Sequence, residues 1–309
     1  MIKQISTYFD KLFFKKWTVG IVAERIEDVI KKRTFEGEIK WIDLKTNKKF
    51  LADPFFLPET KSDNLKILLE DFSITDNYGK ISMIELDSKL EIKENNILLD
   101  TSTHLSYPFI FKEYERIFIF PESGNQKKLS CYEYISETKT LQFVKDIINL
   151  PLFDSTIFRH ENKYWLFGVL MDAEGTNYEL NVYFADSLLG NYRPHLKNPI
   201  KLGLNGTRSA GDFIVTEGEI YRPSQNCQNT YGESITIFKI TELNEETFSE
   251  VPYMTISPDQ FSRRRNRITK IHTINSQVGF ILIDGMVHVF APWLQLKNSI
   301  KYRFRNREK

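Results

Sequence analysis

The chain has 309 residues, of which 41% are hydrophobic and 27% charged, and its net charge is +1. This length allows one large domain or two small ones, and the composition excludes a disordered chain. The near-zero net charge removes the electrostatic basis for a dedicated duplex-DNA binder, so we expect no nucleic-acid partner.

Only residues 23–32 show a helical pattern, and the rest of the chain consists of short apolar runs separated by turns. In chain order, strands are predicted at residues 65–69, 116–120, 164–169, 181–184, 235–240, 279–283 and 286–290. Turns are predicted between strands at Asp76-Asn77, Gly124-Asn125, Leu204-Asn205-Gly206 and Asp284-Gly285. Many short strands without intervening helices indicate an all-β sandwich, barrel or propeller.

A weak internal repeat decides between these architectures. Each unit has a polar residue, an apolar strand, a short turn and a second apolar strand. The units begin at residues 53, 107, 154, 211 and 271, and a four-stranded propeller blade needs roughly 40–50 residues plus loops. We therefore predict a single-domain, five-bladed β-propeller over residues 17–294, with residues 17–23 and 286–290 closing the ring. An N-terminal segment, 1–16, precedes it and a basic tail, 295–309, follows it.

The N-terminal segment and the cysteines bear on location and cofactors. Lysines interrupt every apolar run of residues 1–16, so neither a signal peptide nor a membrane span is predicted, and the cytoplasm is the expected compartment. The same segment could lie on a membrane surface as an amphipathic stretch, which leaves peripheral membrane contact open. Two cysteines, Cys131 and Cys227, suit neither a disulfide framework nor a zinc site, and we expect no metal and no cofactor.

The propeller geometry predicts where the polar residues of the repeat meet. The first strand of each blade lines the central channel, and the second strand returns to the same face. One mouth of the channel should therefore be surrounded by the opening residues Asp53, Tyr107, Asp154 and His272 and the closing residues Glu70, Glu122 and Arg222. Paired carboxylates in an aromatic-rich site suit glycosidic-bond chemistry, in which one is protonated and the other ionised. The alternative is that they only form turns or bind backbone N–H groups.

The fourth unit adds residues that could bind a ligand. Arg208 lies between Gly206 and Gly211, and a guanidinium with small neighbours can hold phosphate or carboxylate oxygens. Arg208 and Arg222 could equally pair with carboxylates of the propeller itself. Gln225 is a candidate for binding sugar hydroxyls. The basic run 263–267 is interpreted as a solvated loop or an anion contact at the rim.

Several motifs of the repeat carry a family resemblance. They are Leu105-Ser-Tyr-Pro-Phe, Pro121-Glu-Ser, Asp154-Ser-Thr-Ile-Phe, Tyr221-Arg-Pro-Ser-Gln, Tyr231-Gly and His272-Thr. At these motifs the chain resembles the N-terminal domain of plant glucosamine inositolphosphorylceramide transferase and its bacterial relatives. Those relatives are similar to the five-bladed propellers of the arabinanase, levansucrase and invertase superfamily. The resemblance covers residues 17–294 and implies the same fold.

The resemblance also implies roles for single residues. In the hydrolase superfamily the first-blade aspartate, matched by Asp53, is the base or nucleophile. This chain has Tyr107 where an aspartate usually tunes the acid. The third-blade acid is usually a glutamate, whereas here Asp154 begins the blade and Glu122 lies just before it. These departures disfavour a plain hydrolase mechanism, and in the plant protein the transferase fold lies in a separate C-terminal domain.

We therefore expect a carbohydrate-active protein of glycan biosynthesis, an enzyme that transfers a sugar from a nucleotide- or phosphate-linked donor. Asp53 would be the general base, assisted by Glu122 or Asp154. The predicted substrate-binding residues are Glu70, Tyr107, Arg208, Arg222, Gln225, Tyr231 and His272, with the two arginines stabilising a phosphate leaving group. Two alternatives remain open. One is an inverting glycoside hydrolase acting on an intracellular oligosaccharide, and the other is a non-catalytic glycan-binding module that partners a separate glycosyltransferase.

Overall fold

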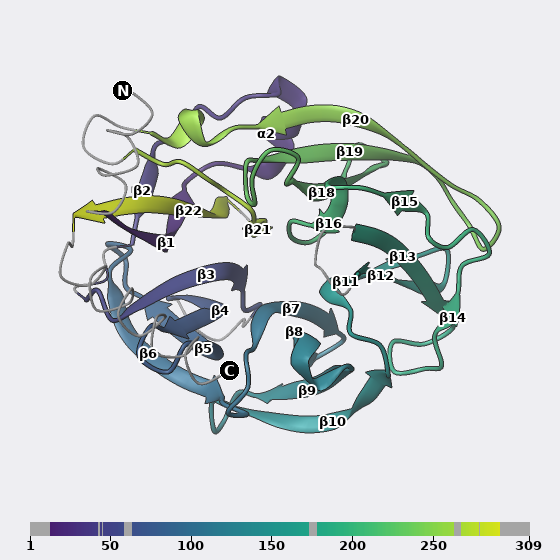
Figure 1. Cartoon of the computed structure of the whole chain (residues 1–309), viewed down its shortest axis with the longest axis horizontal. Coiled ribbons are helices and arrows are strands. Elements are labelled where there is room, and N and C mark those ends of the chain that lie inside the picture. Colours follow the sequence, from purple (N-terminus) through teal and green to yellow (C-terminus); the bar gives the residue numbers. More distant parts are fainter. Residues whose placement is uncertain are drawn as a thin grey trace, which may run out of the picture.

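The computed structural model describes residues 13–42, 44, 46–58, 64–172, 178–262, 267–277 and 279–290. In this part of the chain, five antiparallel sheets follow one another around a central axis (Figure 1). The predicted five-bladed all-β propeller is confirmed. Among the same residues no helix is long and apolar enough to cross a membrane. Residues 1–12, most of the basic run (263–266) and the predicted tail 295–309 lie outside the described residues.

From the channel outward, the first blade contains β3 (Lys49–Phe56), β4 (Leu65–Ser73), β5 (Tyr78–Leu86) and β6 (Ile92–Leu99). The second contains β7 (Ser106–Glu113), β8 (Arg116–Glu122), β9 (Leu129–Ile135) and β10 (Thr140–Ile148), with a 3-10 helix at Gly124–Gln126. The third contains β11 (Phe153–His160), β12 (Lys163–Met171), β13 (Tyr178–Ala185), β14 (Arg193–Pro194) and β15 (Lys201–Leu202). The fourth contains β16 (Asn205–Ser209), β17 (Ile214–Thr216), β18 (Glu219–Asn226), β19 (Ser234–Leu243) and β20 (Phe248–Ile256), followed by a 3-10 helix at Pro258–Phe261.

The fifth blade closes the ring with strands from both ends of the described chain. From the channel outward it contains β21 (Ile274–Gln277), β22 (Phe280–Phe290), β1 (Phe13–Val22) and β2 (Ile39–Trp41). β1 and β22 pair along the whole length of β1, which confirms the predicted closure. β1 begins at Phe13, however, so the propeller starts before the predicted residue 17. The predicted helix is also present, as α2 (Ile26–Lys32), and it lies outside the ring between β1 and β2 in sequence.

The predicted turn at Asp284 and Gly285 is wrong, because β22 runs through both residues. Gly285 pairs with Thr18 of β1, and a Cβ at position 285 would lie only 2.5 Å from the Trp41 ring. This glycine therefore permits close packing between strands instead of forming a turn. The predicted turn at Asn205 and Gly206 is likewise the start of β16.

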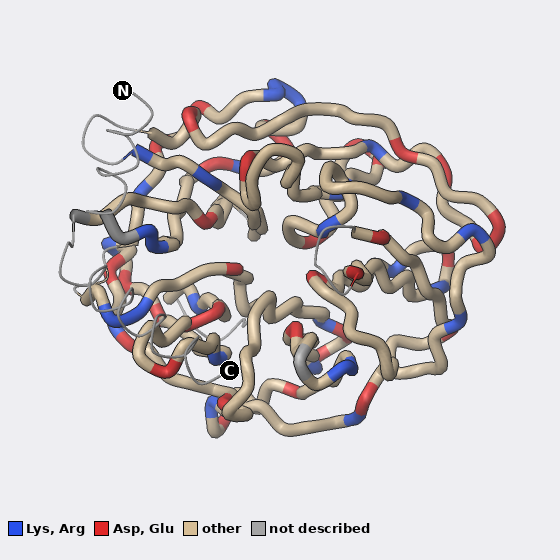
Figure 2. Tube along the Cα trace, in the orientation of Figure 1, with Lys and Arg blue, Asp and Glu red and all other residues tan. Residues whose placement is uncertain are grey.

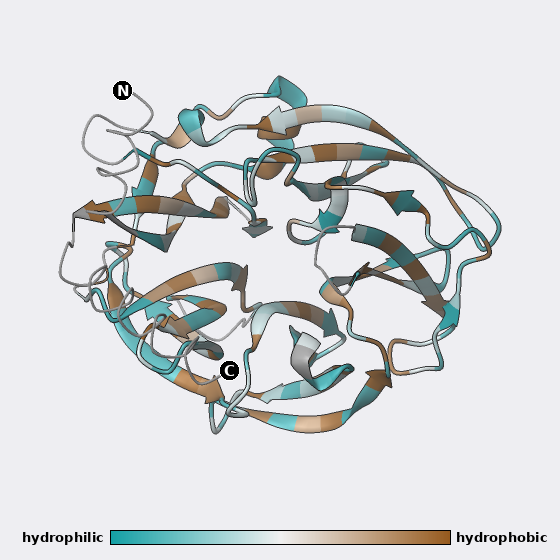
Figure 3. Cartoon of the chain, in the orientation of Figure 1, coloured by the Kyte–Doolittle hydropathy of each residue, from teal (hydrophilic) through white to brown (hydrophobic). Residues whose placement is uncertain are grey.

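Apolar side chains from neighbouring blades pack against each other and form the core. Figure 3 shows hydrophobic residues along the strands of every blade. Between the first and second blades, the rings of Phe55 and Phe109 meet edge to face with their centroids 6.0 Å apart. Phe109, Phe118 and Phe120 are almost completely buried there. Burial of such rings is the main force that holds the blades side by side.

The innermost strands share an irregularity that aims their polar residues at the channel. Asp53, Tyr107 and Asp154 have φ angles of 50°, 40° and 47°. The regular pairing of β3, β7 and β11 shifts at these residues, as in a β-bulge, which re-aims a side chain. A positive φ costs a non-glycine residue on the order of 1–3 kcal/mol, so surrounding contacts must hold the backbone there. The corresponding residue of the fourth blade is Gly211.

At Gly211 the fourth blade comes very close to the fifth. A Cβ at this position would lie 1.8 Å from the carbonyl oxygen of Ile274, and its φ is 133°. We expect Gly211→Ala to lower the free energy of unfolding by roughly 3 kcal/mol or more, because the clash adds to the backbone strain. Gly203→Ala is the control, because φ of Gly203 is also positive, at 107°, but an added Cβ would have no neighbouring atom within 4 Å. It should lower the free energy of unfolding by only about 1 kcal/mol. Urea denaturation measures both, and equal losses would contradict this close approach.

Candidate active site

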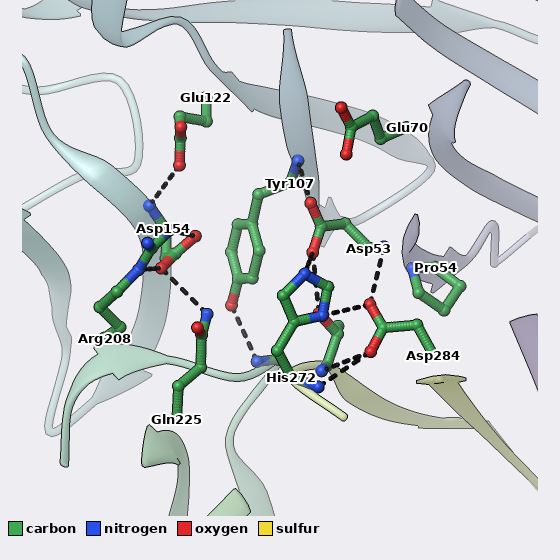
Figure 4. Close-up of polar contacts among 12 residues, drawn as sticks. Asp53, Pro54, Glu70, Tyr107, Glu122, Asp154, Arg208, Gln225, His272 and Asp284 are labelled. Carbon is green, nitrogen blue, oxygen red and sulfur yellow. Dashed lines mark hydrogen bonds and ion pairs between the residues drawn. The ribbon is translucent and has the colours of Figure 1, made fainter. Parts of the chain in front are cut away.

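Carboxylates of one blade bind strained backbone of the next blade at one mouth of the channel (Figure 4). The N–H of Asp53 donates to Oδ2 of Asp284 at 3.1 Å, and the N–H of Tyr107 donates to Oδ2 of Asp53 at 3.2 Å. The N–H of Asp154 donates to Oε2 of Glu122 at 2.9 Å. Each donor is a positive-φ residue of an inner strand. These bonds therefore stabilise the bulges and draw acidic side chains toward the axis, where Figure 2 shows acidic residues at the channel ends of several blades.

Tyr107 extends this network across the channel. Its hydroxyl accepts a hydrogen bond from the N–H of Gly211 at 2.9 Å and lies 2.9 Å from Oγ1 of Thr156. The side chain is fully buried, and burial raises the pKa of its phenol well above the usual value. Tyr107 therefore links the second, third and fourth blades as a neutral phenol and does not act as a base.

The imidazole of His272 lies between two carboxylates. Its Nδ1 is 2.5 Å from Oδ2 of Asp284, and its Nε2 is 3.7 Å from Oδ1 of Asp53. Burial opposes the charged imidazolium, but the negative charges of Asp284 and Asp53 outweigh it and raise the pKa of His272. The ring of Trp17 stacks on the imidazole of His272, at a centroid distance of 4.0 Å and an interplanar angle of 7°. A buried imidazolium thus stabilises two aspartates at once.

Asp53 is the carboxylate best placed for chemistry in this group. Oδ1 accepts a hydrogen bond from the hydroxyl of Thr273 at 2.8 Å, while Oδ2 accepts the N–H of Tyr107. Burial raises the pKa of Asp53, and the positive charge of His272 opposes that rise. One ligand atom each of Asp53, His272 and Asp284 lie within 4.8 Å of one another, as a metal site would require. In this arrangement Nδ1 of His272 is within hydrogen-bond distance of Asp284, and its Nε2 forms a longer ion-pair contact with Asp53.

The side chain of Asp154 is held in place by two residues of the fourth blade. Arg208 binds both carboxylate oxygens through Nε and Nη2, and the amide of Gln225 donates to Oδ2 at 3.1 Å. Burial opposes the charge on Arg208, but the pair with Asp154 outweighs it and raises the pKa of the guanidinium well above its usual value. The guanidinium also lies 5.2 Å from the centroid of the Tyr231 ring. This bidentate pairing makes Asp154 unsuited to exchanging a proton with a substrate.

Two glutamates of the mouth lack a cationic partner of this kind. Burial raises the pKa of Glu122 to about 8, and the charge of Asp154 adds to the effect. Burial also raises the pKa of Glu70 well above its usual value, with the charge of Asp53 as the next cause. Burial thus favours the neutral form of both carboxyl groups. The mouth combines aspartates that contact buried cations with glutamic acids whose neutral form burial favours, and acid–base chemistry on a glycosidic bond uses carboxyl groups in two such environments.

Residues 40–279 match the protein-family model described as "Glucosamine inositolphosphorylceramide transferase 1, N-terminal". The chain belongs to this family. It is 32% identical over 235 residues to the glucosamine inositolphosphorylceramide transferase 1 of Oryza sativa subsp. japonica, a match that covers 74% of this chain and 31% of the relative. With the protein of the same name from Arabidopsis thaliana the identity is 35% over 207 residues, covering 65% and 27%. The chain thus spans less than a third of these relatives.

Two solved structures similar to this chain are those of glycoside hydrolases. A family 117 glycoside hydrolase from Zobellia galactanivorans matches with a TM-score of 0.54 and 11% identity, over 91% of this chain and 92% of that one. A thermostable family-43 glycoside hydrolase matches with a TM-score of 0.53 and 14% identity, over 70% and 81%. At these identities the likeness shows the shared fold alone.

Most of the residues predicted for the site do lie together at this mouth of the channel. They are Asp53, Glu70, Tyr107, Glu122, Asp154, Arg208, Gln225, Tyr231 and His272. Arg222 does not, because it is buried within the fourth blade, where it pairs with Glu250 at 2.7 Å and donates to the carbonyl oxygen of Gly206 at 2.6 Å. Arg222 and Gln225 are three residues apart on a regular strand, so their side chains point to opposite faces. The predicted contact between Arg222 and a leaving group is therefore wrong.

Asp284 is the main residue of the site that the sequence analysis missed. It is completely buried and accepts the N–H groups of both His272 and Thr273 at 3.0 Å. The signal was present, since Asp284 ends an apolar run of β22 as Glu70 does in β4 and Glu122 in β8. Trp17 and Asn275 were missed as well. The amide of Asn275 donates to the carbonyl oxygen of Pro54 at 2.8 Å, beside Asp53.

The protonation of Glu122 predicts a pH-dependent stability. The pKa of Glu122 is about 8 in the folded chain and near 4.5 when unfolded, so its ionisation destabilises the fold increasingly as pH rises between these values. Glu122→Gln cannot ionise but keeps an oxygen for the N–H of Asp154. We expect its Tm to match that of the wild type near pH 4 and to exceed it near pH 9.

Glu133→Gln is the control of opposite sign. A hydrogen bond from Arg116 lowers the pKa of Glu133, so this carboxylate stabilises the fold above its unfolded pKa. Its replacement should lower Tm near pH 9 and have little effect at the acidic end. Thermal denaturation across this pH range measures both variants. A constant Tm difference for Glu122→Gln at all pH values would show that Glu122 is not protonated as described.

Proposed function

We propose that this propeller binds a sugar at the channel mouth and takes part in glycosyl transfer, with Asp53 as the general base that removes a proton from the acceptor hydroxyl. The main support is the setting of Asp53, which accepts hydrogen bonds from Tyr107 and Thr273, contacts His272 and lies among glutamic acids. A base whose pKa is raised toward the operating pH removes protons more effectively. The names of the family and of its plant relatives, which are transferases, favour transfer.

Tyr231 supplies a surface on which a sugar ring could stack. Its side chain is 38% exposed although it lies against His272 and Trp17, both edge to face, at centroid distances of 5.3 and 6.2 Å. Arg208 covers part of the ring. Sugars present apolar C–H faces to aromatic rings while their hydroxyls seek polar partners, and the carboxyl groups of the mouth are such partners.

An anionic donor would bind at the rim of the mouth and not through the predicted arginines, because Arg208 and Arg222 are both paired with carboxylates. Lys270 lies two residues before His272 and donates hydrogen bonds to Oγ1 of Thr230 and to the carbonyl oxygen of Tyr231. Burial lowers the pKa of Lys270, and the positive charge of Lys15 lowers it further. A phosphate beside these two lysines would relieve their repulsion.

A ligand panel tests the class of donor through thermal stability, since a ligand that binds the folded chain raises Tm. The panel contains nucleotide-sugars, free monosaccharides and inorganic phosphate. We expect nucleotide-sugars to raise Tm most, and Lys270→Ala to remove this excess while the response to free sugars stays. If free sugars alone raise Tm, hydrolysis of a neutral glycan becomes the better assignment. If no member of the panel does so, the proposed sugar site is wrong.

Replacement of the base tests the reaction. We expect Asp53→Asn to reduce turnover of the sugar identified by the panel by at least about 100-fold, because the amide cannot take up a proton. Asp186→Asn is the control, since Asp186 is an exposed aspartate that binds Lys163 and Arg193 at the surface. Circular dichroism establishes that both variants are folded. Full turnover by folded Asp53→Asn would exclude the proposed role.

A further inference from the structure

Glu70 does not accept a backbone N–H of the next blade, whereas the corresponding carboxyl groups of two other blades do. Asp284 and Glu122, which end apolar runs in the second strands of their blades, each accept the N–H of the positive-φ residue in the next blade. By its position at the end of the same run in β4, Glu70 should accept the N–H of Tyr107. Oδ2 of Asp53 accepts that N–H instead. The carboxyl group of Glu70 is thereby left out of the network that stabilises the bulges.

The surroundings of Glu70 leave its carboxyl group buried and unpaired. Its side chain is 8% exposed, and Nε2 of His104 lies 3.8 Å from Oε1, which is too long for a hydrogen bond. Gly79 makes room for it, since a Cβ there would lie 2.4 Å from Oε1 of Glu70. A carboxyl group without a donor in such a place keeps its proton. The charged or titratable groups around it are Asp53, Glu122, Asp284, Asp71 and His104.

We propose that Glu70 is the proton donor of the site and that His104 is the positioning residue that stabilises its conjugate base; this assignment rests on the proposed function. Glu122 is less suited, because one of its oxygens already accepts the N–H of Asp154 and is needed by the bulge. Glu70 accepts no such N–H, and it lies on the same side of the mouth as Asp53 (Figure 4). The acid and the base of the reaction then come from the same blade, from β4 and β3.

The proton balance of the step is complete with these two carboxyl groups. The bond between the anomeric carbon and the leaving oxygen breaks, its electron pair goes to that oxygen, and the oxygen takes the proton of Glu70. The acceptor hydroxyl forms the new bond to the anomeric carbon and gives its proton to Asp53. The products are the glycosylated acceptor and the protonated leaving group, with Glu70 ionised and Asp53 neutral. Solvent exchange of protons restores the starting state.

His104 is built to receive the negative charge that Glu70 then carries. Its Nδ1 accepts the N–H of Gly79 at 2.9 Å, which places the proton of the neutral ring on Nε2, the atom nearest to Glu70. Burial lowers the pKa of His104, so the ring is neutral at pH 7. A small movement brings this N–H within hydrogen-bond distance of the new carboxylate. His104 cannot relay a proton, because Nδ1 is occupied.

Leaving groups of different basicity test the assignment, with 2,4-dinitrophenyl and alkyl glycosides of the sugar that binds best. An acid is needed only for the poor alkyl leaving group. Glu70→Gln should therefore lose at least about 100-fold in kcat/KM on the alkyl glycoside and little on the dinitrophenyl glycoside. Asp53→Asn should lose on both. His104→Ala should lower kcat/KM on the alkyl glycoside less than Glu70→Gln does and shift the alkaline limb of the pH profile to higher pH, because the ionised Glu70 loses a donor.

Three results would overturn the proposal or separate it from the proposed function. Equal losses of Glu70→Gln on both glycosides, or the selective loss in Glu122→Gln instead, would show that Glu70 is not the acid. If the wild type turns over neither glycoside, the proposed function fails and the infrared spectrum decides the state of Glu70 alone. At neutral pH the wild type should show the carbonyl band of a protonated carboxyl group that Glu70→Gln lacks, and its absence would contradict the assignment.

Discussion

The backbone of the inner strands is the constraint on which the site depends. In three blades a residue with a side chain, Asp53, Tyr107 or Asp154, occupies a positive-φ position that costs on the order of 1–3 kcal/mol. A carboxyl group from the preceding blade accepts the buried N–H in each case, and such hydrogen bonds contribute about 1 kcal/mol, or about 1.5–3 kcal/mol where the acceptor is charged. The carboxylates are therefore part of what joins the blades, and their convergence on the axis follows from that structural role.

Charge balance at the mouth then determines which carboxyl groups are neutral. Among the described residues of the network, His272 and Arg208 are the buried cations, and they stabilise three aspartates. Neither glutamate has a cation as close as those that bind Asp154 and Asp284, so burial favours their protonated form. Acidic and basic groups that suit sugar chemistry therefore lie together in one cluster. The residues that take part are Asp53, Asp154, Asp284, Glu70 and Glu122.

Much of this arrangement could be predicted from the sequence because the internal repeat indicates which residues begin the inner strands. In the first three units the polar residue that opens the unit is the bulge residue, and this places Asp53, Tyr107 and Asp154 at one mouth. Side-chain direction within a strand could not be derived from the repeat alone, and Arg222 was assigned to the wrong face for that reason. An Asp-Gly pair is a common turn signal, which concealed Asp284 within a continuous strand. The repeat also could not show that Asp53 takes the N–H expected to bind Glu70.

The central claim is that a sugar occupies the space enclosed by this carboxyl network. A crystal structure of the chain with the best ligand of the panel tests it most directly. We expect the sugar ring against Tyr231, with hydroxyl or glycosidic oxygens within hydrogen-bond distance of Asp53 and Glu70. A sugar bound on an outer surface, with the mouth filled by protein side chains or water alone, would contradict the account.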